Sequence, residues 1–537
     1  MRRLRSLAAK LVTALAIAGM LALAVPRSSA AAQPKTLRFI PYADLSIVDP
    51  HWTSGIVTRN YAYMVFDTLF AYDHEFHPRP QMVGSWTESA DHLVWEFTLR
   101  DGLRFHDGAP VRAIDCVLSL KRWAPRNGAY GQPLLAAVTA IEAIDDKRFR
   151  IAVSKPFPVL DALATLSTPT PFILPERLAR TDPYVQIKEV IGSGPFKFVA
   201  SEFVPGSKAV FVKNPDYVPR QEPPDWGSGG KVVKVDRVEW IYIPDPTTAS
   251  QALMTGEVDR WEYANYDLLP LLRQNPEIEI APIFPIGNTA NLRFNQLQPP
   301  FDNVKMRQAV LAVADQREYM TALAGAPENW STCYSFFTCG FPLAKEVGEV
   351  GAEGLTGPRD PEKAKRLIAE AGYKGERIVL LTAVDYAVSQ AQSLVTFEKL
   401  KALGLNIDLV SVDWSTLLKR RTSKEPVDKG GWSMFHTTQP PYDGIDPVQN
   451  IFLRSNGAAA FPGWPTDERM EELIAHWFDV SDPEARRSLA VEVQKRAFET
   501  LPYIPTGQFL VYTAYRKSLT GRIPMHVPFF WNIEKAE

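Results

Sequence analysis

Hydrophobic and polar residues alternate from Val94 to Arg100, which is the spacing of a half-buried β-strand. One side of this strand would carry Trp95, Phe97 and Leu99. Two Asp-Gly turn signals follow, at 101–102 and 107–108. Apolar residues then recur at helical spacing from Ala113. The pattern predicts a strand, a hairpin and a helix that pack together.

Later segments of the chain also change between the spacing typical of helices and that typical of strands. Helical spacing recurs at 360–372, 467–479 and 482–500, and the first and last of these segments open with Asp-Pro. Short β-type runs occur at 405–412, 432–436 and 509–515. Alternating helices and strands predict an α/β fold.

The first 32 residues have the pattern of a secretory signal peptide. Four basic residues precede an apolar run at 11–25, and small residues follow at 28–32. The run is shorter than the roughly 20 apolar residues that a membrane-spanning helix needs. Cleavage after Ala30 and cleavage after Ala32 both fit. Because no cysteine precedes Cys116, we expect a soluble periplasmic protein that is not a lipoprotein.

Length and charge limit the classes of function. A chain of 537 residues is too long for one core, so two or three domains are expected. Loss of residues 1–32 removes five basic residues and no acidic one, which moves the formal net charge from −2 to −7. Nucleic-acid binding needs a concentrated basic face, and the sequence shows none.

Three cysteines bear on the compartment. Cys333 and Cys339 lie six residues apart in an aromatic-rich loop, and in an oxidising compartment we expect a disulfide between them. A metal site is the alternative, but no histidine lies between His106 and His436 to complete one. Cys116 has the setting of a buried apolar residue.

The block at 94–118 closely resembles the signature of the family 5 solute-binding proteins of ABC importers, which bind dipeptides, oligopeptides or nickel. The family block reads Trp-x-Phe-x-Leu-Arg-x-Gly-x-x-Phe-His-Asp-Gly-x-Pro, followed by Ala-x-Asp-Val. The matching residues here are Trp95, Phe97, Leu99, Arg100, Gly102, Phe105, His106, Asp107, Gly108, Pro110, Ala113 and Asp115. Cys116 stands where valine is usual. A second family pattern is matched around 295–315.

The resemblance implies a fold and a division of the chain. It implies an α/β, two-lobe periplasmic-binding-protein fold of type II, with the extra domain of the peptide-binding cluster. Lobe I would combine residues 33–75, 195–285 and 505–537, the extra domain would be 76–194, and lobe II would be 286–504. The ligand cleft would lie between lobes joined by two crossover segments, near Pro285 and Pro505.

The resemblance also implies a role in transport. The protein would capture a peptide, a peptide-like or a cationic small molecule and deliver it to an inner-membrane ABC permease with its ATPase subunits. We expect a monomer that is not an enzyme and uses no cofactor. Two alternatives stay open, a metal-complex or haem-binding importer component and a secreted hydrolase. The chain has neither a nucleophile elbow nor a His-Glu-x-x-His motif.

Relatives that bind peptides pair the ligand's ammonium group with an aspartate, and the resemblance assigns that role to Asp443, in Asp-Gly-Ile-Asp-Pro. An Asp-Gly turn with a solvated carboxylate is the structural alternative. The tryptophan expected three residues earlier is Pro440. The arginine that holds a dipeptide's carboxylate is expected around 380–390, where the chain offers Asp385 instead. A second acidic group would suit a cationic ligand.

Further cleft contacts are expected from aromatic residues near these loops and from one histidine. Most buried tryptophans are core residues, so each is a hypothesis of its own. The candidates are Tyr42, Trp52, Trp432, Phe435, Tyr442, Trp464 and His436.

Overall fold

The computed structural model describes residues 34–480 and 482–536. From Thr36 onward the chain forms one compact unit. The expected signal peptide, at 1–32, lies outside the described residues and stays a prediction. Among the described helices none is long and apolar enough to cross a membrane.

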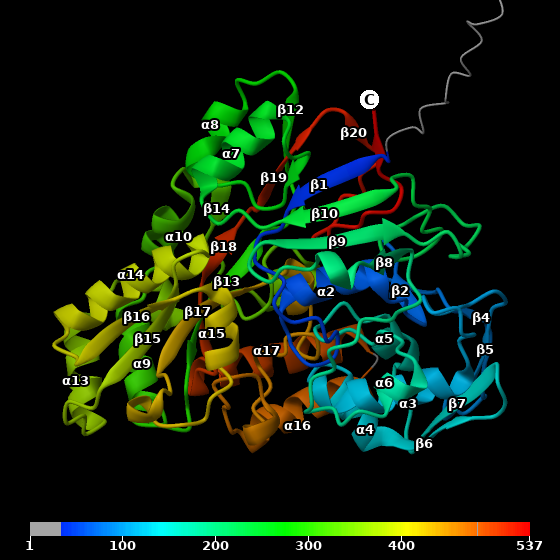
Figure 1. Cartoon of the computed structure of the whole chain (residues 1–537). Helices are drawn as coiled ribbons and strands as arrows, with labels where there is room; N and C mark the ends of the chain where they lie inside the picture. The colour runs from blue at the N-terminus through cyan, green and yellow to red at the C-terminus, as the bar shows by residue number, and fades with distance from the viewer. Residues whose placement is uncertain (1–33, 481, 537) are drawn as a thin grey trace, which may run out of the picture. The chain divides into compact units, whose positions relative to one another are not determined.

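A seven-stranded mixed sheet combines segments from distant parts of the chain (Figure 1). Its strands, in spatial order, are β12 (Ile278–Pro282), β19 (Tyr512–Arg516), β11 (Arg260–Trp261), β1 (Thr36–Ile40), β10 (Arg237–Ile241), β9 (Lys208–Lys213) and β8 (Phe196–Phe198). β1 runs parallel to β10 and β11, and the other neighbours are antiparallel. Leu37 and Phe39 of β1 are fully buried, as the central position of this strand requires.

A six-stranded mixed sheet is the second large layer. Its strands, in order, are β14 (Trp330–Ser331), β18 (Tyr503–Phe509), β13 (Asn288–Phe294), β17 (Met434–Gln439), β15 (Ile378–Ala383) and β16 (Ile407–Val412). Every residue of β15 is buried, as expected for a strand covered on both faces. The helices α10 (Gln316–Ala324) and α14 (Ala387–Ala402) pack against this sheet.

A four-stranded antiparallel sheet contains the strand predicted from alternation. Its order is β4 (Val83–Glu88), β5 (Val94–Leu99), β7 (Arg148–Val153) and β6 (Val138–Ala143). Trp95, Phe97 and Leu99 are its buried residues within β5. Gly102 and Gly108 have φ angles of 80° and 87°, which glycine adopts without strain in tight turns. The helix α3 (Ala113–Trp123) follows, so the predicted strand, turns and helix are confirmed.

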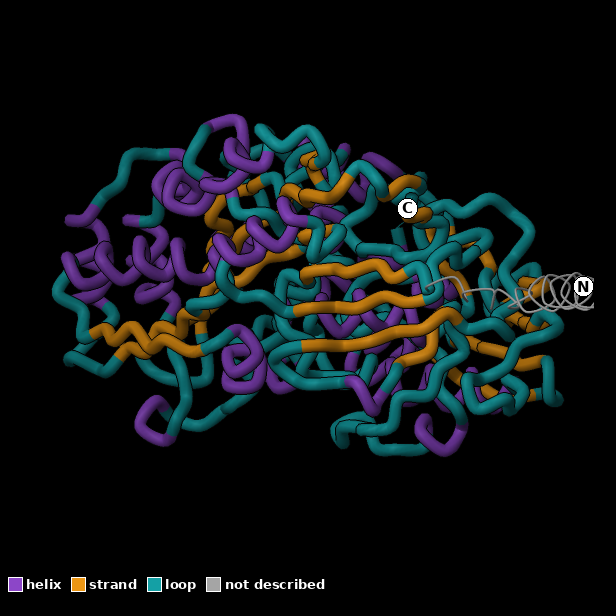
Figure 2. The backbone as a smooth tube through the Cα atoms, turned by 45° about the horizontal axis from the view of Figure 1, so that its top comes forward, coloured by secondary structure: helices purple, strands orange, loops and turns teal. Residues whose placement is uncertain are grey.

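The remaining elements are helices and two short strand pairs, and Figure 2 shows helices lying beside the strand layers. The longer helices are α2 (Ile56–Val65), α4 (Gly131–Ala137), α5 (Val159–Ala164), α7 (Pro246–Thr255), α9 (Val304–Val313), α11 (Pro342–Val347), α13 (Pro361–Glu370), α15 (Trp414–Arg420), α16 (Glu468–His476) and α17 (Pro483–Thr500). Short helices are α6 (Glu176–Ala179), α8 (Leu269–Leu272) and α12 (Glu353–Thr356). Two hairpins pair β2 (Phe70–Tyr72) with β3 (Pro78–Pro80) and β20 (Leu519–Thr520) with β21 (Glu534–Lys535).

The chain passes between the two large sheets at 283–287 and at 510–511. The expected crossover near Pro285 lies within the first of these segments. The expected crossover near Pro505 is wrong, because Pro505 lies inside β18 and pairs with Asn291. A boundary at 504/505 therefore divides a strand, while the remainder of the proposed lobe division stays a prediction.

Candidate ligand-binding site

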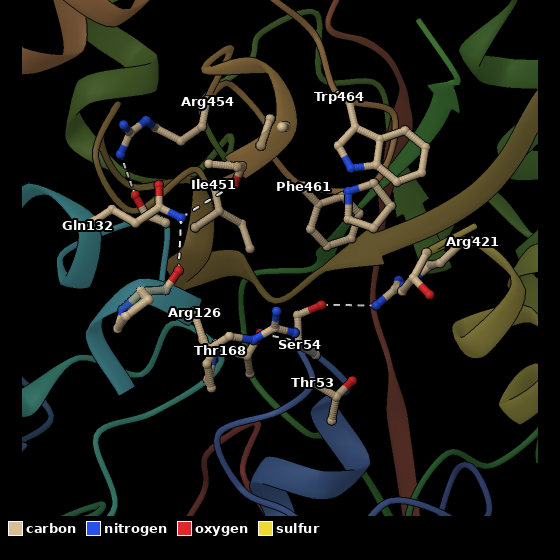
Figure 3. A pocket seen from close by; sticks show the side chains of 18 of the residues that line it. Thr53, Ser54, Arg126, Gln132, Thr168, Arg421, Ile451, Arg454, Phe461 and Trp464 are labelled. Carbon is tan, nitrogen blue, oxygen red and sulfur yellow. Dashed lines mark hydrogen bonds between the residues drawn. The ribbon is translucent and has the colours of Figure 1, made fainter. Parts of the chain in front are cut away.

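Three neighbouring cavities are candidate ligand sites. The large cavity, of about 350 Å³, is bordered by 52–54, by the segment after α3, by the end of α15 and by 451–464 (Figure 3). A small cavity of about 30 Å³ shares Ser54, Thr168, Leu418, Arg421, Ile451 and Phe461 with it. A third cavity, of about 230 Å³, is called the tyrosine cavity because six tyrosines line it. It shares Tyr42 and Tyr386 with the small cavity. Together they form a row of neighbouring spaces suited to an elongated small molecule.

Asp443 lines the small cavity. It lies in a 3-10 turn (Pro441–Gly444) directly after β17, and its side chain is almost fully buried. Its Oδ1 atom has no hydrogen-bond partner among the described residues. Burial raises the pKa of Asp443 to about 7, and the nearby Arg59 guanidinium offsets part of that rise. An incoming ammonium group would both neutralise and hydrogen-bond this carboxylate.

A disulfide-closed loop supports the turn that carries Asp443. Cys333 and Cys339 are joined by a disulfide. Thr338, inside this loop, donates its backbone N–H to the Gly444 carbonyl at 2.9 Å. A side chain at Gly444 would meet the Thr338 hydroxyl at 2.3 Å, so only glycine permits this approach. The disulfide-closed loop is therefore linked to the turn that carries Asp443 by the hydrogen bond between Thr338 and Gly444.

Asp385, the second predicted acidic residue, lines the tyrosine cavity and not the small one. Its Oδ1 accepts from the Trp414 backbone N–H and its Oδ2 from the Tyr242 hydroxyl, each at 2.7 Å. Both oxygens are already engaged, unlike Oδ1 of Asp443. The tyrosine cavity takes its name from Tyr42, Tyr242, Tyr263, Tyr266, Tyr386 and Tyr512.

The structure separates the other predicted contacts into two groups. Trp52, Tyr42 and Trp464 line cavities. Phe435, Trp432, Tyr442 and His436 are fully buried and border none of the described cavities named above.

Each member of the buried group has neighbours within the fold. Trp432 packs on Phe435 and on Trp464, so it supports a cavity wall from behind. Tyr442 lies against the Arg59 guanidinium, 5.5 Å from its ring centre. Burial lowers the pKa of His436 to about 3, and its Nε2 lies 2.8 Å from the Thr396 hydroxyl. Direct ligand contact by this group stays a prediction.

Three arginines that the sequence did not single out line the large cavity, Arg126, Arg421 and Arg454 (Figure 3). Arg421 directly follows α15 and ends a Lys-Arg-Arg run, a pattern typical of a solvated helix end. Arg126 follows α3 at the end of a short 3-10 helix, Ala124–Arg126. Only the packing of α15 against the 52–54 segment shows that Arg421 is buried.

β17 offers a strand edge beside Asp443. It pairs with β13 along its whole length, but with β15 only at Met434 and Phe435. Its last residues, Thr437 to Gln439, line the small cavity. Within the described chain, no strand pairs with this part of β17 on the β15 side.

A family model described as bacterial extracellular solute-binding proteins, family 5 middle, matches residues 77–457. The chain belongs to this family. It is 40% identical over 523 residues to a probable peptide ABC transporter periplasmic-binding protein of Sinorhizobium fredii, which covers 96% of this chain and 97% of the relative. The resemblance inferred from 94–118 is confirmed.

Solved structures support the fold. A periplasmic binding protein from A. tumefaciens R10 in complex with agropinic acid has a TM-score of 0.77, with 22% identity, 94% of this chain covered and 99% of the other. A periplasmic binding protein of Helicobacter pylori in complex with the peptide STSA also gives 0.77, with 21% identity and 94% and 98% covered. The expected α/β periplasmic-binding-protein fold is confirmed. The family and these relatives are solute-binding transport proteins.

Proposed function

We propose that this protein is the periplasmic substrate-binding component of an ABC importer for a peptide or peptide-like molecule that carries a free ammonium group. The family membership and the name of the relative from Sinorhizobium fredii support this role. The ligand would lie in the row of three neighbouring cavities. The loaded form would then be recognised by an inner-membrane permease with its ATPase subunits, and the binding component would act as a monomer without catalysing a reaction.

The observation that carries this proposal is the buried carboxylate of Asp443. A buried charge is costly unless it is paired. Asp443 lines the small cavity, so a ligand in that cavity can supply the missing partner. Arg59 interacts with Asp443 electrostatically, but its hydrogen bonds go to the Leu166 carbonyl and to Asn60. A ligand ammonium would supply the missing direct contact.

The edge of β17 supports an extended peptide. Peptides commonly add to a free strand edge through backbone hydrogen bonds, which give affinity without depending on side-chain identity. The Thr437–Gln439 stretch provides such an edge next to Asp443. A peptide's first residue would lie at Asp443 and its backbone along β17.

A metal-binding role has less support. Asp73, Glu75 and His77 form the group of described residues placed closely enough to hold an ion. Asp73 is already paired with Arg79 at 2.7 Å, and these residues do not border the three cavities. The site geometry favours an organic ligand.

The test is a thermal-shift and calorimetry screen of the protein without residues 1–32. Alanine peptides of two to five residues should raise the unfolding temperature, and their N-acetylated forms should not. Asp443→Asn should weaken binding of the free-amine peptides by about 100-fold, the loss typical of a buried charge pair. Asp408→Asn, at an exposed site that borders none of the three cavities, is the control and should retain affinity within about threefold. Equal binding of acetylated and free peptides would refute the role of Asp443.

A further inference from the structure

The large cavity carries an excess of positive charge. Its lining includes Arg126, Arg421, Lys424 and Arg454, and none of the described residues that line it is an aspartate or a glutamate. Arg454 is neutralised from behind by Glu471 at 2.6 Å. Lys424 is exposed and lies over the Trp464 ring. The two remaining cations, Arg126 and Arg421, form no salt bridge with a carboxylate of the described chain, and Asp49 acts on Arg126 only electrostatically.

Arg421 is the more deeply buried of these two cations, with 4% of its surface exposed. Its Nη2 donates to the Ser54 hydroxyl at 2.9 Å, and its guanidinium lies 4.8 Å from the ring centre of Phe461. Its buried Nε has no hydrogen-bond partner. Burial lowers the pKa of Arg421 to about 10, and the group nevertheless stays charged at neutral pH.

Arg126 reaches the same part of the cavity from the opposite side of the 52–54 segment. Its Nη2 donates to the Trp52 carbonyl at 2.5 Å, two residues from the Ser54 contact of Arg421. Its Nε is also buried without a partner. Figure 3 shows both guanidinium groups beside Ser54, at the wall of the cavity. Two guanidinium groups, each with an Nε that lacks a hydrogen-bond partner, therefore contact the same segment, 52–54.

An uncompensated buried cation is costly, and planar guanidinium groups match carboxylate and phosphate oxygens through paired N–H bonds. We propose that Arg421 and Arg126 form an anion subsite in the large cavity, which holds a carboxylate or phosphate group of the transported molecule. The ligand is then an amphoteric molecule, with its ammonium group at Asp443 and its anionic group at Arg421. The sequence has no arginine around 380–390, where dipeptide binders hold the ligand carboxylate. Arg421, directly after α15, would take that role here.

This assignment rests on the proposed function, because it places the anion on the same ligand that meets Asp443. The small cavity connects the two groups, since Asp443 and Arg421 both line it. The large cavity, at about 350 Å³, has room for more than a carboxylate. Side chains of a short acidic peptide, or a phosphorylated end, would also fit the charge of the lining.

The experiment compares alanine peptides of two to five residues as free acids and as C-terminal amides. A third set carries phosphoserine amide as its last residue, which separates a phosphate from a carboxylate. Wild-type protein should bind the free acids, the phosphoserine amides, or both, about 100-fold more tightly than the plain amides. In Arg421→Gln that ratio should fall below about tenfold, and Arg126→Gln should lower it less.

Arg420→Gln is the matched control. Arg420 is the last residue of α15 and precedes Arg421, but it donates to the Gly430 and Gly431 carbonyls and lines none of the three cavities. It should leave the ratio unchanged. The wild-type comparison needs no variant and decides the matter even if Arg421→Gln fails to fold. Plain amides that bind as tightly as both anionic sets would overturn the anion subsite while leaving the proposed peptide role intact.

If no peptide in any form binds, the proposed ligand class fails, and the subsite is tested separately. Inorganic phosphate and succinate at millimolar concentration should then stabilise the wild type against heat and leave Arg421→Gln unaffected. Absence of stabilisation by both anions, or equal stabilisation of the variant, would overturn the subsite.

Discussion

Ile283 donates its backbone N–H to the carbonyl of Val511 at 2.8 Å, which ties the two crossover segments together. On one side of this bond, Pro282 pairs with Tyr512 in the seven-stranded sheet. On the other side, Asn288 pairs with Phe509 in the six-stranded sheet. The connection between the sheets is therefore an almost continuous antiparallel ribbon, and 284–287 is its irregular part. Motion between the sheets would have to occur there.

Gly287 allows the closest approach within this ribbon. A Cβ atom at this position would lie 2.5 Å from the Phe509 carbonyl oxygen, so Gly287→Ala forces the backbone to shift. We expect a loss of about 1–3 kcal/mol in stability, measured by thermal unfolding. Gly128→Ala is the control, since its new methyl group would have no neighbour closer than 3.9 Å. Equal melting temperatures for both variants would contradict a close-packed crossover.

Asp443 should make the ligand-free protein less stable as the pH rises. Its pKa is raised to about 7 in the folded state, against about 4 when unfolded. The proton is therefore held more tightly by the folded chain, and the associated stability is present below pH 4 and lost as the pH rises through 7. Asp443→Asn should be more stable than wild type at pH 8, by up to about 4 kcal/mol, but not at pH 4. Asp408→Asn, at an exposed position, should show no such crossover in thermal melts.

The same titration should appear in ligand binding. An ammonium ligand needs the ionised carboxylate, while the free protein holds a proton on Asp443 below pH 7. Affinity should rise about tenfold per pH unit from pH 5 to 7 and level off above, with one proton released on binding. Calorimetry in two buffers of different ionisation enthalpy measures that proton directly. A wild-type profile as flat as that of Asp443→Asn would contradict the assignment.

Asp49 and Arg122 form a buried ion pair that anchors the segment entering the cleft. Two Arg122 nitrogens donate to the two carboxylate oxygens at 3.0 and 2.7 Å, and both side chains are almost fully buried. Arg122→Met should lower the free energy of unfolding by about 3–5 kcal/mol, because it leaves Asp49 buried and unpaired. Adding Asp49→Asn should recover part of this loss in a double-mutant cycle of melting temperatures.

The exposed pair of Arg377 and Asp408 provides the comparison for this cycle. The matching substitution Arg377→Met should cost at most about 1 kcal/mol, as is usual for surface pairs. A similar loss of stability in both variants would mean that burial does not determine how much stability is lost when the Asp49–Arg122 pair is broken.

The disulfide should influence ligand affinity as well as stability. Replacing Cys333 and Cys339 by serine should cost about 2 kcal/mol, from the entropy of a short loop. It should also weaken binding, because Thr338 would no longer hold the Gly444 carbonyl beside Asp443. A reducing agent should lower the wild-type melting temperature similarly. Cys116→Ala, which removes the buried free thiol, should keep that sensitivity. A wild type that is insensitive to reduction would refute the stabilising role.

Local pattern was enough for several parts of the fold. Alternation identified β5, Asp-Gly turns marked Gly102 and Gly108, and Asp482 began α17 as an N-terminal cap. The crossover that the resemblance placed near Pro505 was wrong, because β18 and β19 are separated by only two residues and nothing local marks where one sheet ends and the other begins. Proline is tolerated in β18, where the register shifts next to it.

The sequence by itself determined the family and the α/β architecture, because motifs and periodicity are properties of neighbouring residues. The resemblance also pointed to Asp443 as a candidate ligand contact, but only the structure shows that its Oδ1 has no hydrogen-bond partner among the described residues. Only the tertiary structure decided which side chains face the cavities. Trp432 and His436 proved to be interior residues, while Arg421, in an ordinary basic run, is buried against Ser54. Whether Arg421 is buried and has a counter-charge depends on segments that lie more than 300 residues away in the sequence, such as the one that contains Ser54. A local sequence pattern cannot show such contacts.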